Sequence, residues 1–154
     1  MGASGIYSVA QHSVLVSQHV PDADAMWGLL HDAHEAIVGD ASSPLKVALR
    51  AIESRTGRVP GLDFDNVKSS WDELEETVAN RVRRAFGLVG AMPATVATAD
   101  LQAVVTERRD LLGDRQTRPW GIEAQPWPGQ ILPWPPRVAE QEFLDAFEKL
   151  GGRR

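Results

Sequence analysis

The sequence contains no cysteine, and this absence excludes disulfides, thiolate metal sites and cysteine nucleophiles. Any metal site must therefore use nitrogen and oxygen ligands. No run of about eighteen apolar residues occurs, and the first residues lack the basic and apolar segments of a signal peptide. We therefore expect a cytoplasmic protein without a membrane partner.

Positive charge is also scarce, because 16 Lys and Arg residues stand against 21 Asp and Glu residues, for a net charge of −5. Binding of duplex nucleic acid relies on clustered basic side chains that neutralise phosphates, so we expect no nucleic-acid partner. A small phosphorylated ligand is compatible with this charge, since a bound metal ion can supply local positive charge. The 154 residues, 43% of them hydrophobic, are typical of one globular domain over residues 1–154.

No segment alternates apolar and polar residues at the two-residue period of a strand. Apolar residues instead recur at steps of three and four, bounded by glycine and proline, and this spacing predicts helices. The expected helices span residues 7–20, 22–38, 44–55, 64–86, 94–112 and 137–150. Residues 113–136 are rich in proline and tryptophan and predict an irregular segment that packs over the core. We expect an all-α, single-domain bundle of about five to seven helices.

All four histidines lie within the first 34 residues, at His12, His19, His31 and His34. His31 is followed directly by Asp32, after an apolar stretch that would carry the pair into the interior. Buried charged groups are rare unless they are paired or bind a metal. Such a pair on a helix is nevertheless more often a surface group or a satisfied polar contact, so the residues alone leave both interpretations open.

Glu35 lies four residues after His31 and three after Asp32, which places all three on neighbouring positions of a continuous helix. There Glu35 could hydrogen-bond a water held by a metal ion without itself binding that ion. His19 is close to a proline and is interpreted as a helix-end residue, whereas His34 is either exposed or near a substrate. The charged run over residues 107–110 is interpreted as a solvated or intersubunit face.

Four strings in the sequence resemble the HD-domain phosphohydrolases of the bacterial 5'-nucleotidase branch. They are YSVAQHS, LLHDAHEAIVGDASSPLK, ATADLQAVVTERRDLL and ILPWPPRVAEQEFLDAF, in this order. That branch includes enzymes that act on deoxynucleoside monophosphates and phage enzymes that remove triphosphate from dATP. The resemblance covers nearly the whole chain. It implies a metal-dependent phosphohydrolase acting on a small-molecule nucleotide, and a homo-oligomer, either a dimer or a hexamer.

The resemblance also implies roles for individual residues. The implied metal ligands are His12, His31, Asp32 and Asp100. Glu35 and Asp40 match the acidic residues that act in catalysis, and Lys46 matches a lysine that contacts the substrate phosphate. Mixed nitrogen and oxygen ligation suits cobalt, manganese, zinc, iron or magnesium and does not select among these ions.

The sequence departs from the family in two places that concern phosphate binding. Relatives usually carry a longer segment before the tyrosine-serine-valine string, with an arginine that contacts phosphate, whereas six residues precede Tyr7 here. Many relatives also carry a lysine three residues before the last metal ligand, where this chain has Ala97. Either the N-terminal segment is shortened relative to the family, which is the preferred interpretation, or Lys46, Arg50 or Arg108 takes over the phosphate contact. The alternative is a non-catalytic HD protein that binds metal and nucleotide.

Overall fold

The structure is a computed structural model that describes residues 6–55, 68–112 and 121–153. Within these residues all regular secondary structure is helical and no strand is present. The expected all-α fold class is therefore confirmed. No helix in the described part of the chain is long and apolar enough to cross a membrane. Internal contacts divide the chain into a first unit, Met1–His31 with Gly90–Arg154, and a second unit, Asp32–Val89.

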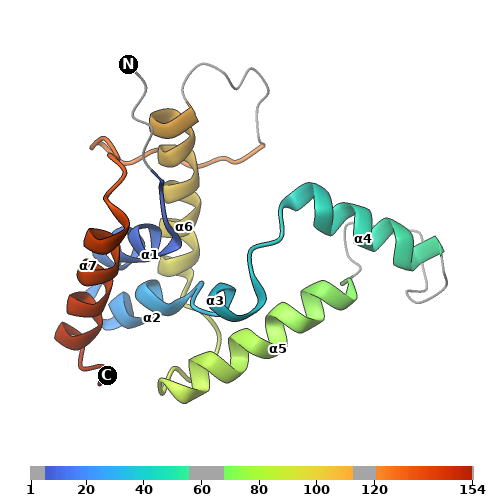
Figure 1. The fold of residues 1–154 in the computed structure, drawn as a ribbon, viewed down its shortest axis with the longest axis horizontal. Coiled ribbons are helices and arrows are strands. Elements are labelled where there is room, and N and C mark those ends of the chain that lie inside the picture. The colour runs from blue at the N-terminus through green and yellow to red at the C-terminus, as the bar shows by residue number, and fades with distance from the viewer. Residues whose placement is uncertain (1–5, 56–67, 113–120, 154) are drawn as a thin grey trace. The chain divides into compact units, whose positions relative to one another are not determined.

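The first unit is built from four α-helices and two short helical turns (Figure 1). They are α1 Val9–Gln18, η1 Asp22–Asp24, α2 Ala25–Leu30, α6 Ala94–Glu107, the π-helical turn η2 Arg108–Leu112, and α7 Pro136–Lys149. Helix α1 packs against α2, α6 and α7. Its core is formed by buried apolar side chains that recur on the facing sides of these helices: Val14, Val16, Leu29, Leu30, Val96, Ala99, Ala103, Ala139 and Phe147.

Helices α1 and α2 approach each other closely at Gly28. A Cβ atom at this position would lie 2.9 Å from the Ser17 Cα atom, a separation that real Cβ atoms essentially never show. The Ser17 hydroxyl donates a hydrogen bond of 2.8 Å to the Ala25 carbonyl across the same contact. The lack of a side chain at Gly28 thus lets the two backbones meet, and this contact sets the spacing between α1 and α2.

The irregular segment before α7 is fastened to α1 and α6 by hydrogen bonds to its backbone. Gln11 is fully buried; its amide donates to the Leu132 carbonyl and its carbonyl oxygen accepts from the Trp134 N–H, both at 2.8 Å. The Thr106 hydroxyl accepts from the Trp127 N–H at 2.9 Å. Trp127 itself is buried. The expected packing over the core is therefore seen at Trp127 and Ile131, whereas Leu132 is 62% exposed. Residues 113–120 of the segment lie outside the described residues.

Two charged residues of η2, Arg109 and Asp110, bind the backbone of the same segment. Arg109 bonds Asp110 at 2.7 Å and donates to the Trp127 carbonyl at 2.8 Å, while Asp110 accepts from the Ile131 N–H at 2.7 Å. The hydrogen bond from Arg109 lowers the pKa of Asp110. The Asp110 side chain is only 6% exposed. The expectation of a solvated face is therefore wrong for Asp110, which bonds the backbone of the covering segment, whereas Arg109 is exposed.

The expected helix over residues 22–38 is wrong as a continuous helix, because a turn at residues 31–34 separates α2 from α3 Glu35–Val38. The His31 ring donates from Nδ1 to the Gly28 carbonyl at 2.7 Å. A continuing helix would pair that carbonyl with the N–H of Asp32, so the ring competes with the backbone. The Glu35 N–H then bonds the Asp32 carbonyl at 2.9 Å, a tighter three-residue step.

The second unit contains α3, α4 Ser43–Arg55 and α5 Ser70–Ala85 (Figure 1). Helix α4 matches the expectation for residues 44–55. Helix α5 begins later than expected because Ser69 forms a capping box with Asp72. The Ser69 hydroxyl accepts from the Asp72 N–H at 3.3 Å, and the Asp72 carboxylate accepts from the Ser69 N–H at 2.7 Å. Residues 64–67 of the expected helix lie outside the described residues.

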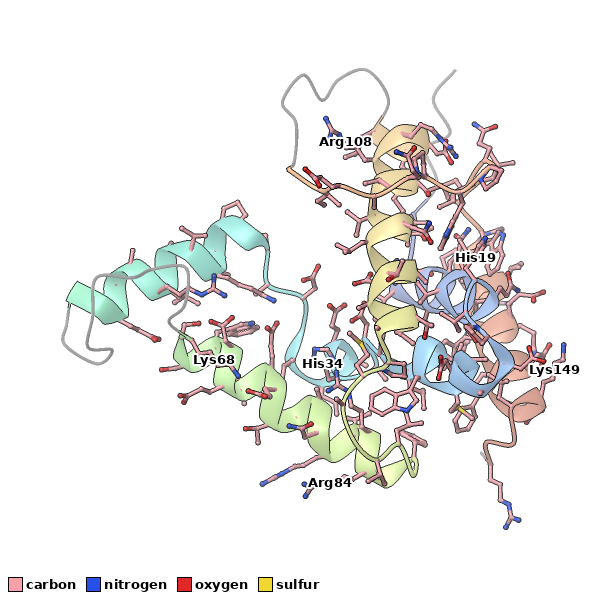
Figure 2. The ribbon with its side chains drawn as sticks, turned by 180° about the vertical axis from the view of Figure 1, so that it is seen from behind. His19, His34, Lys68, Arg84, Arg108 and Lys149 are labelled. Atoms are coloured by element: carbon pink, nitrogen blue, oxygen red, sulfur yellow. The ribbon has the colours of Figure 1, made fainter. Side chains whose placement is uncertain are left out.

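Polar contacts join α4 to α5. Lys46 pairs with Glu75 at 2.8 Å, and Arg50 pairs with Asp72 through two hydrogen bonds of 2.9 and 3.0 Å. Lys68 precedes α5 (Figure 2) and pairs with Glu76 of that helix. Buried apolar side chains of the described part of this unit are small: they belong to Ala41 and Ala79.

Candidate metal centre

Two histidine rings from different helices meet inside the first unit. His12 lies in the middle of α1, and His31 directly follows α2. The Nε2 atoms of the two rings are 3.2 Å apart. The residues are buried, with 8% of His12 and 4% of His31 exposed. Water therefore has little access to these nitrogens, and their partners must come from the protein or from a bound ligand.

The hydrogen bonds on the opposite sides of the rings fix where the protons are. His31 Nδ1 faces the Gly28 carbonyl at 2.7 Å, and a carbonyl can only accept, so His31 carries its proton on Nδ1. His12 Nδ1 faces a Glu107 carboxylate oxygen at 2.6 Å and likewise donates. In their neutral forms, both rings therefore direct an Nε2 lone pair toward the same point.

Two lone pairs at 3.2 Å repel each other unless a positive charge lies between or beside them. Two nitrogens bound at about 2.0 to 2.1 Å to one tetrahedral ion lie about 3.4 Å apart, and at a right angle they lie about 2.9 Å apart. The observed separation falls between these values. The two rings thus have the spacing and the orientation of two ligands to one metal ion.

Asp100, from the middle of α6, brings negative charge to the same point. Its Oδ1 atom lies 3.2 Å from His12 Nε2 and 3.7 Å from His31 Nε2. Burial raises the pKa of Asp100, but hydrogen bonds with the two histidines hold it well below its usual value. Burial lowers the pKa of His12, yet hydrogen bonds with Asp100 and Glu107 raise it to about 9. The cluster therefore favours a positive charge at its centre.

Asp32 follows His31 in the chain and adds a fourth group. One of its carboxylate oxygens and one ring nitrogen each of His12 and His31 all lie within 4.8 Å of one another. Asp32 is half-buried. The structure thus brings together the residues that the sequence suggested as ligands, with Asp100 near both rings and Asp32 grouped with them. The carboxylates and imidazoles are a donor set that suits a divalent transition-metal ion.

Glu107 is a part of this cluster that sequence reasoning missed. It was assigned to a solvated charged run, but its side chain is 22% exposed and contacts His12. The Tyr7 hydroxyl donates to the same Glu107 oxygen at 2.8 Å. Burial, followed by the nearby Glu107 charge, raises the pKa of Tyr7. One sequence signal was available: Glu107 lies seven residues after Asp100, about two helical turns, and therefore on the same face of α6.

The three other residues implied by the family resemblance belong to the second unit. Glu35 begins α3 and is half-buried, while Asp40 is exposed after the helix ends at Gly39, whose φ is 79°. Lys46 lies in α4 and pairs with Glu75 at 2.8 Å. The resemblance implies that the Lys46 ammonium group contacts the substrate phosphate. Within the second unit, this group is instead paired with the Glu75 carboxylate.

The remaining histidines stay apart from the cluster in their contacts. His19 caps the end of α1, as expected for a helix-end residue, and its ring stacks on Trp127 with centroids 3.7 Å apart (Figure 2). Its Nδ1 bonds the Leu15 carbonyl at 2.8 Å. His34 is half-buried at the start of α3, and its Nδ1 has no hydrogen-bond partner among the described residues.

Comparison with known proteins gives relatives but no family. The chain is 38% identical over 108 residues to the uncharacterized protein YfdR of Escherichia coli (strain K12), covering 70% of this chain and 50% of that protein. It is 30% identical over 100 residues to the uncharacterized protein RCAP_rcc00048 of Rhodobacter capsulatus, covering 60% of this chain and 42% of that protein. The chain thus spans half or less of the length of these relatives. No family model and no solved structure matches.

Proposed function

We propose that this protein is a divalent-metal-dependent phosphohydrolase that acts on nucleotides or deoxynucleotides. The observation that carries the proposal is the pair of His12 and His31 Nε2 atoms, 3.2 Å apart and directed to one point beside Asp100. The resemblance of the sequence to HD-domain phosphohydrolases supports the choice of phosphate chemistry.

The ligands of the ion would be two imidazoles and two carboxylates, from His12, His31, Asp32 and Asp100. A bound divalent ion would acidify water and offset the negative charge of a phosphate. Cobalt, manganese, zinc, iron and magnesium are all candidates, and the two nitrogen ligands favour the transition metals over magnesium. The four side chains orient the reaction by holding the ion at one fixed, buried point.

Glu35, with Asp40 as its alternative, would act on the attacking water. The carboxylate would accept the water's proton as the water oxygen forms its bond to the phosphorus nearest the sugar. The bond between that phosphorus and the sugar oxygen would then break, and the sugar oxygen would take up a proton. The products are a nucleoside and phosphate, or a nucleoside and triphosphate when the substrate is a triphosphate.

A second function has one observation in its favour, namely a protein that binds metal and nucleotide without hydrolysis. Lys46, the implied phosphate contact, is paired with Glu75 at 2.8 Å, and Arg50 is paired with Asp72. A phosphate would have to compete with these carboxylates. A cation at the transferred phosphoryl group would stabilise the charge that develops during hydrolysis. Two basic side chains already paired with carboxylates therefore favour binding without hydrolysis.

The test is release of phosphate or nucleoside from a panel of mono-, di- and triphosphates, after removal of metal and addition of cobalt, manganese, zinc, iron or magnesium. We expect metal-dependent turnover, with deoxynucleotides cleaved faster than p-nitrophenyl phosphate. Equal turnover of every phosphoester would contradict nucleotide specificity. Metal and nucleotide binding by calorimetry without turnover would favour the second function. Light scattering on the same sample tests the dimer or hexamer implied by the resemblance.

A further inference from the structure

Glu107 stands behind a proposed metal ligand and cannot itself reach the point where the two Nε2 atoms meet. It contacts His12 at Nδ1, the far side of the ring, at 2.6 Å. Asp100 contacts the same ring at Nε2, at 3.2 Å. Both carboxylates project from one face of α6, seven residues apart. The helix therefore holds His12 from both sides, with one carboxylate at the ion's position and the other behind the ring.

Tyr7 restricts the Glu107 carboxylate. Its hydroxyl donates at 2.8 Å to the same Oε1 atom that faces His12. With two donors on one oxygen, Glu107 is held in a single orientation as an acceptor. Tyr7, which is half-buried, precedes α1 by two residues, so the chain from Tyr7 through Glu107 to His12 links the start of α1 to the end of α6.

The two histidines differ in what lies behind them. His31 donates to the neutral carbonyl of Gly28, whereas His12 donates to the charged carboxylate of Glu107. A carboxylate behind a ligating histidine fixes the ring tautomer and increases the basicity of the nitrogen that faces the ion. His12 is therefore the stronger donor of the pair.

We propose that Glu107 is a positioning residue of the metal centre, which holds His12 in the tautomer that presents Nε2 to the ion, and that Tyr7 holds Glu107 in turn. The inference rests on the metal binding in the proposed function and adds two residues to that site. It makes a claim about the metal-free protein as well, since the tautomer is set before any ion binds.

The experiment compares three variants with the parent protein. Glu107→Gln keeps an acceptor for the His12 N–H but removes the charge, Glu107→Leu removes the acceptor, and Tyr7→Phe frees the carboxylate. The matched control is Glu142→Gln, which removes the same charge from an exposed position on α7. One measurement is the affinity for cobalt(II) by titration calorimetry. The other is the tautomer of the His12 ring in the metal-free protein, from its nitrogen-15 chemical shifts at a pH above the His12 pKa of about 9, where the ring is neutral.

We expect Glu107→Gln to weaken cobalt binding about 10- to 100-fold while the His12 proton stays on Nδ1. Glu107→Leu should weaken binding at least as much and give a mixture of His12 tautomers. Tyr7→Phe should have a smaller effect in the same direction, and the control should bind cobalt like the parent. A merely structural Glu107 would change the melting temperature without changing the tautomer.

Two outcomes would overturn the inference. One is a folded Glu107→Leu protein whose His12 proton stays on Nδ1 and whose cobalt affinity equals that of the parent. The other, which decides the matter if Glu107→Leu does not fold, is unchanged cobalt affinity in Glu107→Gln. Failure of the proposed function is distinguishable, because a parent protein that binds cobalt but hydrolyses no nucleotide would refute the phosphohydrolase and leave the test of Glu107 intact.

Discussion

Each of the two units of this protein is stabilised internally by a different kind of interaction. The first unit buries large apolar side chains such as Leu29, Val96 and Phe147 between α1, α2, α6 and α7. In the second unit, α4 and α5 are joined by Lys46–Glu75 and Arg50–Asp72, and the buried apolar side chains among its described residues are those of Ala41 and Ala79. Apolar packing is insensitive to salt, whereas partly exposed ion pairs are screened by it. Salt should therefore loosen the second unit before the first.

This difference coincides with a division among the functional residues. His12, His31 and Asp100 belong to the packed first unit, whereas the second unit begins at the proposed ligand Asp32 and contains the residues proposed to act on water and phosphate. Metal binding needs fixed geometry, which a close-packed core provides. The following predictions use this division and are ordered from the largest expected effect to the smallest.

The largest effect is expected from loss of a ligand in the first unit. His31→Ala removes one of the two converging nitrogens, so the protein should bind no stoichiometric metal and lose its phosphohydrolase activity. Elemental analysis and turnover of the best nucleotide measure both effects. His19→Ala, at the exposed end of α1, is the matched histidine control and should keep metal and activity. Metal retained at full occupancy in His31→Ala would place the ion elsewhere.

A change in the second unit should separate chemistry from binding. Glu35→Ala should keep the metal, since the four ligands are complete without it. Loss of a general base lowers rates about 10²- to 10⁴-fold, or roughly 3 to 5 kcal/mol of transition-state stabilisation. The measurement is kcat beside metal content. Turnover within a few-fold of the parent would transfer the role to Asp40, and loss of the metal would make Glu35 a ligand.

Equivalent leucines test the difference in packing. Leu29 is fully buried in the first unit, whereas Leu74 on α5 is 45% exposed. Leu29→Ala should lower the free energy of unfolding by about 2 to 5 kcal/mol, because it leaves a cavity in a close-packed core. Leu74→Ala should cost within about 0.5 kcal/mol. Urea denaturation followed by circular dichroism gives both values. Equal losses would show that the second unit is packed like the first.

The smallest effect concerns acid stability of the second unit. Burial raises the pKa of Asp72, but hydrogen bonds from Arg50 and Ser69 lower it to about 2. Folding thus favours the ionised form, and this contribution is present above about pH 4 and lost as the pH falls through 2. Because the pair is partly exposed, Asp72→Asn should cost about 1 kcal/mol at pH 6 and little at pH 2. Urea midpoints at both values test this.

The control for the acid prediction is Glu73→Gln, which removes a neighbouring charge from an exposed position in the first turn of α5. Glu73→Gln should lower the free energy of unfolding less than Asp72→Asn does, because Glu73 takes no part in the capping box with Ser69. An equal cost for both variants at pH 6 would assign the effect to the helix dipole instead of to the capping box and the Arg50 pair.

The helices themselves were accessible from the sequence, because apolar spacing and chain-breaking residues are local signals. Helix α4 was predicted to within one residue, and the expected helical end at residue 38 matches the end of α3 at Val38. The break at residues 31–34 was not predictable, because it depends on a bond from the His31 ring to the backbone. Apolar spacing also predicted too early a start for α5, because the capping box at Ser69 sets where this helix begins.

The sequence suggested the ligands of the candidate site but not Glu107, the residue that contacts one of them from behind. His12, His31 and Asp100 were chosen through the family resemblance, and their convergence depends on helix packing that spacing alone does not encode. Glu107 was missed because a run of four charged residues gives no indication of which side chain is directed inward. The sequence signal that distinguished Glu107 from the other charged residues of the run is its position two helical turns after Asp100, on the same face of α6.

The close approach at Gly28 has a consequence for how this protein can change over evolutionary time. Gly28 lacks a side chain where α2 meets Ser17, and its carbonyl fixes the His31 ring. A methyl group there would have to displace the backbone of α1, which also carries His12. We therefore expect homologues that retain both histidines to retain this glycine, and homologues that have lost the histidines to vary freely at it. A residue without any functional group would thus be inherited together with the metal centre.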